Sequence, residues 1–219
     1  MSMKAVIFDF NGTLFFDTHL HVDTWKKFAK EKFNEDLDDE GFKLKIYGRD
    51  NNAILKDSYG IKDLDEVHRL SEEKEQWYRD VCDTLDIDLV PGARDFFDYL
   101  KDNHILFTIA TGACKSNVDY YFDVFELGKW FDMDKVVYDD GHIPGKPNPT
   151  VFNMAIEKLG VKPEDCIIFE DSTAGVEAAY KAGVNYYDTA YIYPGSEAAL
   201  GEIFEKNQIR DKVYIATKL

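Results

Sequence analysis

The chain has 219 residues and a formal net charge of −16, with 45% hydrophobic and 31% charged residues, so it is long enough to bury a sizeable core. The strong negative charge argues against a nucleic acid or an anionic membrane as partner, because both require a basic surface. The three cysteines, Cys82, Cys114 and Cys166, have no zinc or CxxC spacing, and no segment has the pattern of a signal peptide or a membrane span. We therefore expect a cytoplasmic protein with reduced thiols, either a monomer or a homodimer.

Short apolar runs alternate with stretches of helical periodicity along most of the chain. The runs that predict strands are Ala5–Phe8, Leu106–Thr111, Val136–Tyr138, Cys166–Phe169, Tyr186–Thr189 and Val213–Thr217. The helices predicted between them include Ala93–Lys101, Ser116–Phe122, Pro149–Leu159 and Ala174–Ala182. This alternation is typical of α/β proteins and predicts a Rossmann-like, doubly wound parallel sheet.

The segment that begins at Asp17 interrupts the alternation. It is highly charged, has almost no strand pattern and places apolar residues such as Trp25 and Phe28 at helical spacing. We interpret it as an inserted cap of about four helices, which ends at the turn Val90-Pro91-Gly92. The predicted domains are an α/β core of residues 1–16 and 91–219, with an atypical tail at 183–219, and a helical cap of residues 17–90.

Polar residues follow the ends of four predicted elements. They are Asp9 and Asn11, Thr111 and Gly112, Lys146, and Glu170 and Asp171. Because ligands of parallel α/β sheets gather at the carboxyl ends of the strands, these residues are candidate site residues. A carboxylate can attack phosphorus and form an acyl phosphate, which makes Asp9 a candidate nucleophile. Mg²⁺ prefers a few carboxylates with water and phosphate oxygens, and Asp9 and Asp171, with Glu170 nearby, can supply the carboxylates.

The remaining candidates suit the phosphate itself. Lys146 can neutralise charge on a transferring phosphoryl group, and Thr111 with the backbone amides after Gly112 can hydrogen-bond its oxygens. Each residue alone also has an ordinary explanation, since a strand-end Asp or Thr is commonly a turn residue or a helix cap. Likewise, Glu170-Asp171-Ser172 before a helix can be its cap and complement its dipole. Their joint order, each at a strand end, favours phosphoryl transfer.

Four motifs carry a resemblance to a known family. They are DFNGTL at Asp9–Leu14, TG at Thr111-Gly112, GKPNP at Gly145–Pro149 and FEDSTAGVEAA at Phe169–Ala179. Together they resemble the haloacid dehalogenase superfamily phosphatases, in the branch with a helical cap that includes β-phosphoglucomutase-like enzymes. The resemblance covers about residues 3 to 183.

The resemblance implies a role for each matching residue of the core. It implies a nucleophile at Asp9 and Mg²⁺ held by Asp9, the backbone carbonyl of Asn11 and Asp171, with Glu170 assisting. It also implies phosphate contacts from Thr111, Gly112 and Lys146, which are the three residues that the motifs place at the phosphate.

Two cap segments also match the family. The segment Tyr47–Asp50 resembles a Gly-Arg segment that faces the active site, and His21 and Trp25 resemble a His…Trp pair on the first cap helix. Arg49 is therefore a candidate for binding a distal anionic group of the substrate, and an ion pair with a nearby acid is the equal alternative. His21 is a candidate for binding a substrate hydroxyl, or else an ordinary core-edge residue.

The activity implied is Mg²⁺-dependent hydrolysis of a small phosphorylated metabolite, such as a sugar phosphate, through an aspartyl phosphate at Asp9. Asn11 departs from the family, which has Asp there as acid and base, because an amide cannot exchange a proton near neutral pH. Several explanations of Asn11 remain open. The family branch can tolerate Asn with a lower rate or with another residue as the base. The position can also have been altered to trap the acyl phosphate, or the chain can catalyse a different reaction. The alternatives are a β-phosphoglucomutase-like phosphomutase and a catalytically weak phosphometabolite-binding protein. Replacing Asn11 by Asp is expected to raise turnover at least about tenfold.

The tail after Ala182 resembles a different family. Residues 182–219 are similar to a stretch of aldo-keto reductases, with Asp188, Tyr193 and Lys218 at three positions of that family's catalytic tetrad. A (β/α)₈ barrel needs about 200 residues, and the fourth tetrad residue is missing, so we expect a structural role. The tail is predicted to add a last core strand at Tyr186–Thr189, a covering helix at Ser196–Lys206, and an edge strand or loose end at Val213–Thr217.

Overall fold

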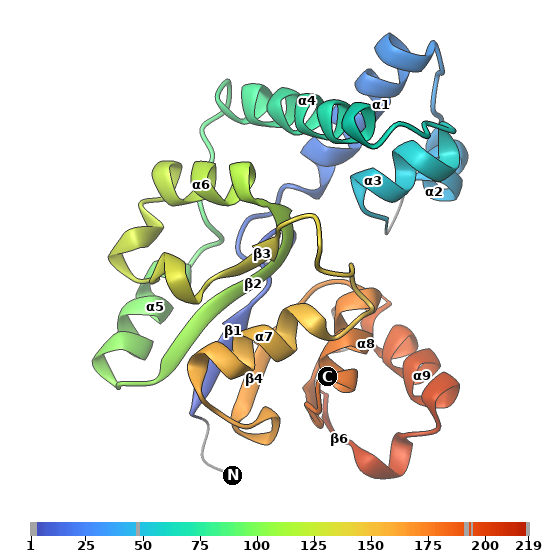
Figure 1. The fold of residues 1–219 in the computed structure, drawn as a ribbon. Helices are drawn as coiled ribbons and strands as arrows, with labels where there is room; N and C mark the ends of the chain where they lie inside the picture. The colour runs from blue at the N-terminus through green and yellow to red at the C-terminus, as the bar shows by residue number, and fades with distance from the viewer. Residues whose placement is uncertain (1–3, 47–48, 191–192, 194, 218–219) are drawn as a thin grey trace.

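A computed structural model describes residues 4–46, 49–190, 193 and 195–217. In this part of the chain, four parallel strands form the central sheet in the order β3-β2-β1-β4 (Figure 1). The strands are β1 (Ala5–Phe8), β2 (Leu106–Cys114), β3 (Val137–Asp139) and β4 (Cys166–Phe169). The central strand β1 is buried at every residue, as its continuous apolar run predicts for a strand covered on both faces. The predicted parallel α/β sheet is confirmed.

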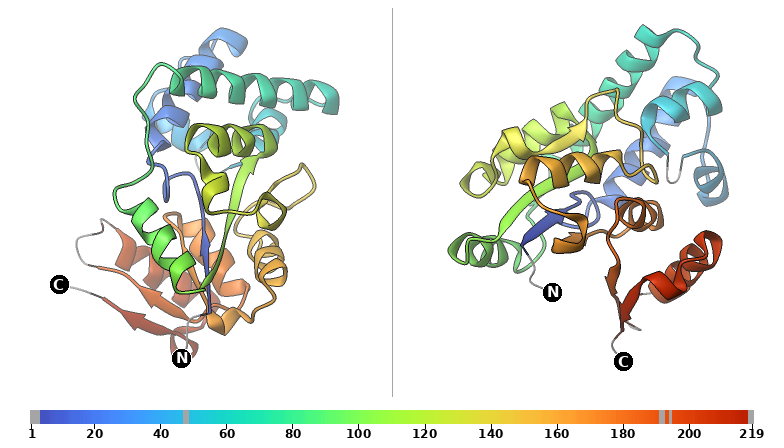
Figure 2. Two further views of the ribbon diagram at one scale, coloured as in Figure 1. Left: turned by 90° about the vertical axis from the view of Figure 1, so that its left-hand side faces the viewer. Right: turned by 60° about the horizontal axis from the view of Figure 1, so that its bottom comes forward.

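Helices cover both faces of the sheet (Figure 2). Alternate side chains of β1 point to opposite faces, so Val6 and Phe8 pack with α5 and α6, while Ala5 and Ile7 pack with α7 and α8. The helices are α5 (Ala93–Asp102), α6 (Lys115–Val124), α7 (Thr150–Leu159) and α8 (Thr173–Lys181). The ring of Phe8 contacts the rings of Phe96, Phe97 and Phe131. The doubly wound arrangement is therefore confirmed.

Further helices lie between β1 and α5, beyond the carboxyl ends of the strands (Figure 1). They are α1 (Thr18–Phe33), α2 (Asp39–Lys45), α3 (Asn51–Ala53) with a π-helical turn at Ile54–Ser58, and α4 (Leu64–Cys82). Trp25, Phe28, Ile54 and Val67 belong to a hydrophobic cluster of these helices alone. Asp38, Asp50 and Asp63 accept hydrogen bonds from backbone amides at helix starts, as N-cap aspartates do. None of the helices in the described residues is both long and apolar enough to cross a membrane.

The strand β2 continues past its predicted end at Thr111 to Cys114. It does so because β3 pairs with it as far as the Cys114–Asp139 position, across an irregularity in the register. The residue at the N-cap of α6 is Cys114. The simple helix-cap explanation of Thr111 is therefore wrong, and Thr111 lies in the strand.

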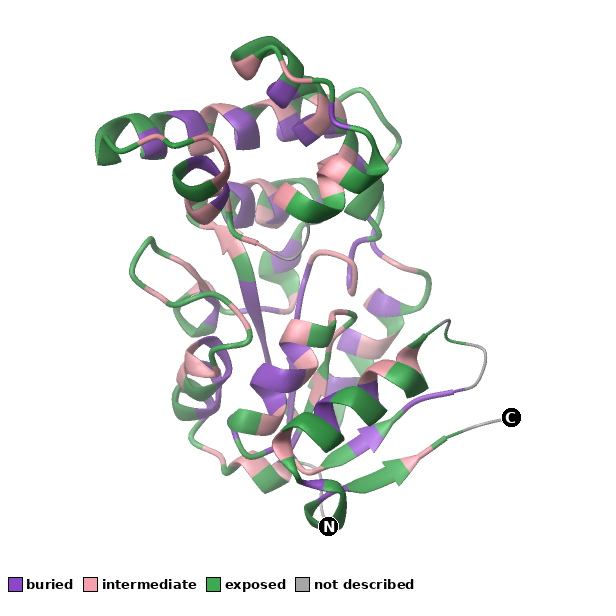
Figure 3. Ribbon diagram, turned by 90° about the vertical axis from the view of Figure 1, so that its right-hand side faces the viewer, coloured by how far each residue is buried: buried purple, intermediate pink, exposed green. Residues whose placement is uncertain are grey.

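The tail forms a unit of its own, with β5 (Tyr186–Asp188), α9 (Ser196–Asn207) and β6 (Tyr214–Ala216). In the described residues, β5 pairs in parallel with β6 and does not join β4, so the prediction of a last core strand is wrong. The reason is that β5 finds its backbone partners within its own strand–helix–strand unit, whose cluster packs against Val176 and Tyr180 of α8. The edge strand is confirmed as β6, which is largely exposed (Figure 3).

Candidate active site

Two neighbouring strands bring three carboxylates together. Phe8 and Phe169 are partners in the register of β1 and β4, so the residues that follow them leave the same edge of the sheet side by side. The amide of Asp9 donates to the carbonyl of Phe169 at 2.9 Å. One carboxylate oxygen from each of Asp9, Glu170 and Asp171 lies within 4.8 Å of the others. This cluster is the candidate reaction centre.

Lys146 completes the cluster from the segment between β3 and α7. Its ammonium Nζ donates to Asp9 Oδ1 at 2.7 Å and to Glu170 Oε2 at 2.6 Å. The side chain of Lys146 is 13% exposed. Although burial lowers the pKa of Lys146, the charges of Asp9 and Glu170 raise it above its ordinary value, so this side chain is a cation in the cluster.

The cluster carries excess negative charge. Burial, together with the charges of Glu170 and Asp171, raises the pKa of Asp9 to about 7 despite the opposing effect of Lys146. Burial and the charge of Glu170 also raise the pKa of Asp171. The three carboxylates can carry more negative charge than one ammonium neutralises, so a divalent cation would be attracted to the cluster. An all-oxygen donor set suits a hard ion such as Mg²⁺. The residues present therefore fit the metal that the resemblance implies.

Glycines allow two of the carboxylates to approach the backbone. Gly12 has a φ of +78°, and a Cβ at this residue would lie 2.3 Å from Asp171 Oδ2. A Cβ at Gly175 would lie 2.0 Å from the carboxyl carbon of Glu170. Any side chain at these two positions would displace a carboxylate of the cluster.

Hydrogen bonds fix the two carboxylates that follow β4. Glu170 Oε1 accepts from the amide of Ser172 at 3.0 Å and from its hydroxyl at 2.6 Å. The same hydroxyl accepts from the amide of Gly175 at 3.0 Å, so Ser172 also caps α8, as one of the ordinary explanations required. Asp171 Oδ1 accepts from the hydroxyl of Thr13 at 3.2 Å. The capping role of Ser172 and the acidic cluster therefore occupy the same segment.

Thr111 and Gly112 lie near the end of β2, the strand beside β1. Thr111 is 2% exposed, and its hydroxyl oxygen accepts from the amide of Ala113 at 3.1 Å. Gly112 is exposed, and a Cβ there would meet nothing within 4 Å. Both residues occupy the edge of the sheet that carries the carboxylates, and their contacts with phosphate stay predictions.

The side chain of Asn11 belongs to a polar cluster that the sequence did not predict. Asn11 Nδ2 donates to Asp17 Oδ2 at 2.5 Å and to the hydroxyl of Tyr121 at 2.8 Å. Tyr121 donates to the hydroxyl of Tyr78 at 3.2 Å, and Tyr78 donates to Asp17. The four residues form a closed ring, which we call the Asn11–Asp17–Tyr78–Tyr121 ring, and Asp17 in it is fully buried. In the sequence, Tyr78 stands at helical spacing beside Trp77 and Val81, as an apolar core residue would, so the sequence holds no signal for this ring.

His21 contacts the same ring from α1. Its Nε2 lies 3.3 Å from Asp17 Oδ2, and its ring stacks on Tyr78 with centroids 3.9 Å apart. His21 Nδ1 lies 2.9 Å from Nζ of Lys74, a buried lysine that also donates to Glu75 Oε1 at 2.8 Å. The structure thus pairs His21 with a cation that the sequence interpretation missed, although Lys74 lies one helical turn before Tyr78 on α4.

Arg49 lies in the helical insertion, where its guanidinium pairs with Asp57 and donates to the hydroxyl of Ser58 at 3.0 Å. The ion pair that was the alternative to substrate binding is therefore present. The neighbouring residue Asp50 lies close to the Lys146 segment, since a Cβ at Gly145 would be 3.8 Å from Asp50 Oδ2. The predicted neighbours of Arg49 at positions 47 and 48 lie outside the described residues.

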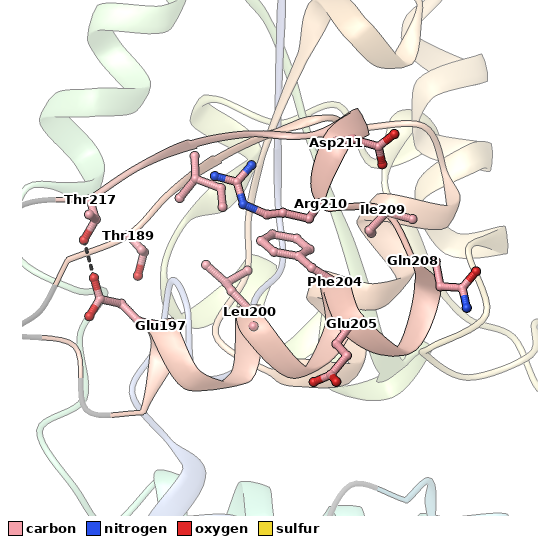
Figure 4. Close-up of a pocket in the computed structure, with 12 residues that line it drawn as sticks. Thr189, Glu197, Leu200, Phe204, Glu205, Gln208, Ile209, Arg210, Asp211 and Thr217 are labelled. Carbon is pink, nitrogen blue, oxygen red and sulfur yellow. Dashed lines mark hydrogen bonds between the residues drawn. The ribbon is translucent and has the colours of Figure 1, made fainter.

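A cavity of about 860 Å³ lies apart from this cluster, between α9 and β6 of the tail (Figure 4). Leu200, Phe204 and Ile209 line it, and none of the predicted site residues does so. Of the tetrad-like residues, Asp188 ends β5, Tyr193 is exposed, and position 218 lies outside the described residues. The acidic cluster, in which the pKa values of Asp9 and Asp171 are raised, is the better candidate for chemistry.

Several proteins of known or inferred activity are similar to this chain. The "Phosphorylated carbohydrates phosphatase" of Thermotoga maritima is 31% identical over 190 residues, which cover 83% of this chain and 82% of that protein. The "Beta-phosphoglucomutase" of Bacillus subtilis is 28% identical over an aligned region that covers 83% of this chain and 81% of that protein.

Solved structures give the same relationship. A "HAD hydrolase, family IA, variant 3" from Entamoeba histolytica superposes with a TM-score of 0.81 and 36% identity, over 98% of this chain and 92% of that one. A "putative beta-phosphoglucomutase" from Thermotoga maritima superposes with a TM-score of 0.66 and 26% identity, over 99% and 94% of the two chains.

Sequence models of two families match the chain. The Aldo/keto reductase family matches residues 161–219 only, which is the tail and the elements just before it. The haloacid dehalogenase-like hydrolase model matches residues 3–183, which include the whole acidic cluster and Lys146. The chain belongs to the haloacid dehalogenase-like hydrolase family.

Proposed function

We propose that this protein is a Mg²⁺-dependent phosphatase of a small phosphorylated metabolite, and that the metabolite is a sugar phosphate. The observation that carries this proposal is the Lys146 ammonium between Asp9 and Glu170, beside the carboxylate of Asp171. The similarity to a phosphatase of phosphorylated carbohydrates supports the class of substrate.

In the proposed reaction, a carboxylate oxygen of Asp9 bonds to phosphorus while the ester P–O bond breaks, and water later hydrolyses the acyl phosphate. Lys146 neutralises charge on the transferring group, and Thr111 and Gly112 contact its oxygens. Asp9, Asp171, Glu170 and the carbonyl of Asn11 would hold Mg²⁺, which supplies further neutralisation of charge when bound. The leaving oxygen takes its proton from water, because the Asn11 amide does not supply one.

The test is release of inorganic phosphate from a panel of sugar phosphates, with Mg²⁺ and with EDTA. The proposal expects metal-dependent release from at least one sugar phosphate. If no member of the panel and no aryl phosphate is hydrolysed, while phosphate still binds, the protein is a phosphometabolite-binding protein instead.

A phosphomutase is the second candidate, and Asn11 is the observation that favours it. Without a general base at position 11, the phosphoenzyme lives longer, which gives a bound product time to reorient and take the phosphoryl group back. The similarity to a β-phosphoglucomutase supports this reaction class. Conversion of a hexose 1-phosphate to the 6-phosphate without net release of phosphate separates the mutase from the phosphatase.

The affinity for Mg²⁺ is expected to rise with pH through about 7. The metal binds the ionised carboxylate, and burial with the neighbouring negative charges raises the pKa of Asp9 to about 7. Calorimetric titration with MgCl₂ at pH 6 and pH 8 should show several-fold tighter binding at pH 8. An affinity that is equal at both pH values would contradict a metal site that includes Asp9, and Asp171→Asn should weaken binding at both.

Sugar monophosphates are expected to be better substrates than bisphosphates. Arg49, the predicted binder of a distal anionic group, is already paired with Asp57, and Lys74 beside His21 is paired with Glu75, so a second phosphate would meet neutralised partners in an acidic protein. We expect kcat/KM for fructose 6-phosphate to exceed that for fructose 1,6-bisphosphate about tenfold. Equal or higher kcat/KM for the bisphosphate would show that Arg49 exchanges Asp57 for substrate.

Removal of the tail after Val184 is expected to leave phosphate binding within about twofold of the full chain, because the binding residues lie in other elements. The unfolding temperature should fall, since the tail cluster packs against Val176 and Tyr180 and Lys206 pairs with Glu177 at 3.0 Å. Calorimetry and thermal unfolding measure both effects. Loss of phosphate binding in a folded truncated protein would assign the tail a role at the site.

A further inference from the structure

The Asn11–Asp17–Tyr78–Tyr121 ring joins the candidate active site to the helical insertion. Asn11 follows β1 and Tyr121 is on α6, whereas Asp17 precedes α1 and Tyr78 is on α4. Asp17 is fully buried. Its carboxylate accepts hydrogen bonds from Asn11, from Tyr78 and, at 3.2 Å, from the amide of Gly12, and His21 Nε2 lies 3.3 Å from it. A buried carboxylate is stable only with such donors.

Counting donors shows what the ring requires of position 11. Asn11 gives two N–H donors, one to Asp17 and one to the hydroxyl of Tyr121, and this leaves the Tyr121 proton for Tyr78 and the Tyr78 proton for Asp17. A carboxylate at position 11 has no donor and a carboxylic acid has one. Aspartate at position 11, in either protonation state, therefore leaves the ring short of a donor beside a buried acceptor.

We propose that Asn11 and Asp17 form a matched amide–carboxylate pair, in which position 11 accepts a carboxylate only if position 17 carries the amide. Exchanging the two side chains reverses the direction of the ring. The amide at position 17 can donate to the carboxylate at position 11 and to Tyr78, while its oxygen still accepts from Gly12. Tyr78 then donates to Tyr121, and Tyr121 donates to position 11, so that every donor within the ring again has an acceptor. The contact of His21 Nε2 with the carboxylate at position 17, 3.3 Å in the original protein, is lost in the exchange, so stability is recovered only in part.

This pairing explains why the chain departs from its family at a residue of the active site. An acid–base group is absent at position 11 because the carboxylate at position 17, which contacts it, already carries the negative charge of the pair. The gain in turnover expected from Asn11→Asp therefore belongs to the exchanged pair, and the single variant should show less of it. The part of this inference that concerns turnover rests on the proposed phosphatase activity, whereas the part that concerns stability does not.

The experiment is a double-mutant cycle with Asn11→Asp, Asp17→Asn and the exchanged variant that carries both, read by thermal unfolding without metal. Each single variant should lower the unfolding temperature by about 5 °C or more, and the exchanged variant should regain at least half of the summed loss. The matched control combines Asp17→Asn with Asn103→Asp, an exposed position with the same change of composition, and should show additive losses.

Additive losses in the exchanged variant would overturn the pairing. If Asn11→Asp yields no folded protein, a folded exchanged variant supports the proposal and an unfolded one overturns it. Phosphate release is the second measurement, and the exchanged variant should exceed the original protein about tenfold or more. Recovered stability without this gain would support the pairing and count against the proposed acid–base chemistry at position 11.

Discussion

Replacement of Asp9 by Asn is expected to lower phosphatase turnover at least about 10⁴-fold, because an amide cannot form the acyl phosphate. The same substitution should raise the stability of the metal-free protein at pH 8. Burial raises the pKa of Asp9 to about 7, so ionising this carboxylate in the folded state removes stability as the pH rises from about 4 to 7. A neutral amide avoids that loss.

Phosphate release and thermal unfolding at pH 5 and pH 8 measure the two effects. The matched control is Asp119→Asn, which removes a carboxylate that pairs with Lys115 at an exposed site. It should change neither turnover nor the pH dependence of stability. Turnover of the Asp9 variant within tenfold of the original would show that another residue is the nucleophile.

Replacement of Lys146 by Met is expected to lower turnover about 10²- to 10³-fold, as loss of one preorganised electrostatic contact does. The ammonium donates to Asp9 and Glu170 at 2.7 and 2.6 Å, so its loss leaves two buried carboxylates without their cation. Because Lys146 lowers the pKa of Asp9, the acid limb of the pH–rate profile should also move to higher pH.

A pH–rate profile of this variant with saturating Mg²⁺ separates charge neutralisation from folding. Lys115→Met serves as the control, because Lys115 pairs with Asp119 at the surface, and it should keep both the rate and the profile. A Lys146 variant with full turnover and an unmoved acid limb would remove Lys146 from the site.

The sequence allowed the meeting of Asp9, Glu170 and Asp171 to be predicted, because the apolar runs before them form neighbouring parallel strands that end at the same edge of the sheet. Two parallel strands of four residues, β1 fully buried and β4 partly exposed, have Phe8 opposite Phe169 and so place the residues that follow them side by side. The position of Lys146 was less well determined by the sequence, because Lys146 lies between β3 and α7, where no periodicity fixes its position, and the family motif strengthened its candidacy.

The ring around Asn11 and the pairing of the tail could not be predicted, for a different reason. Tyr121 lies 110 residues from Asn11, and tyrosines at helical spacing give the same pattern whether their hydroxyls bind water or a buried Asp. The run that forms β5 would equally suit a strand beside β4, and its actual partner is chosen by packing of α9 on α8. Non-local contacts decide both features.

Because β5 joins β6 instead of β4, the described core sheet ends at β4. Ile167 and Phe169 of that strand are each 40% exposed, so partly exposed apolar side chains accompany the last strand of the described core sheet, and an end strand of this kind can pair with another chain unless it is protected. Repulsion between copies, each with a net charge of −16, keeps such edges apart at low ionic strength. Salt screens that repulsion, so we expect self-association to increase with ionic strength through the same strand that supports Glu170.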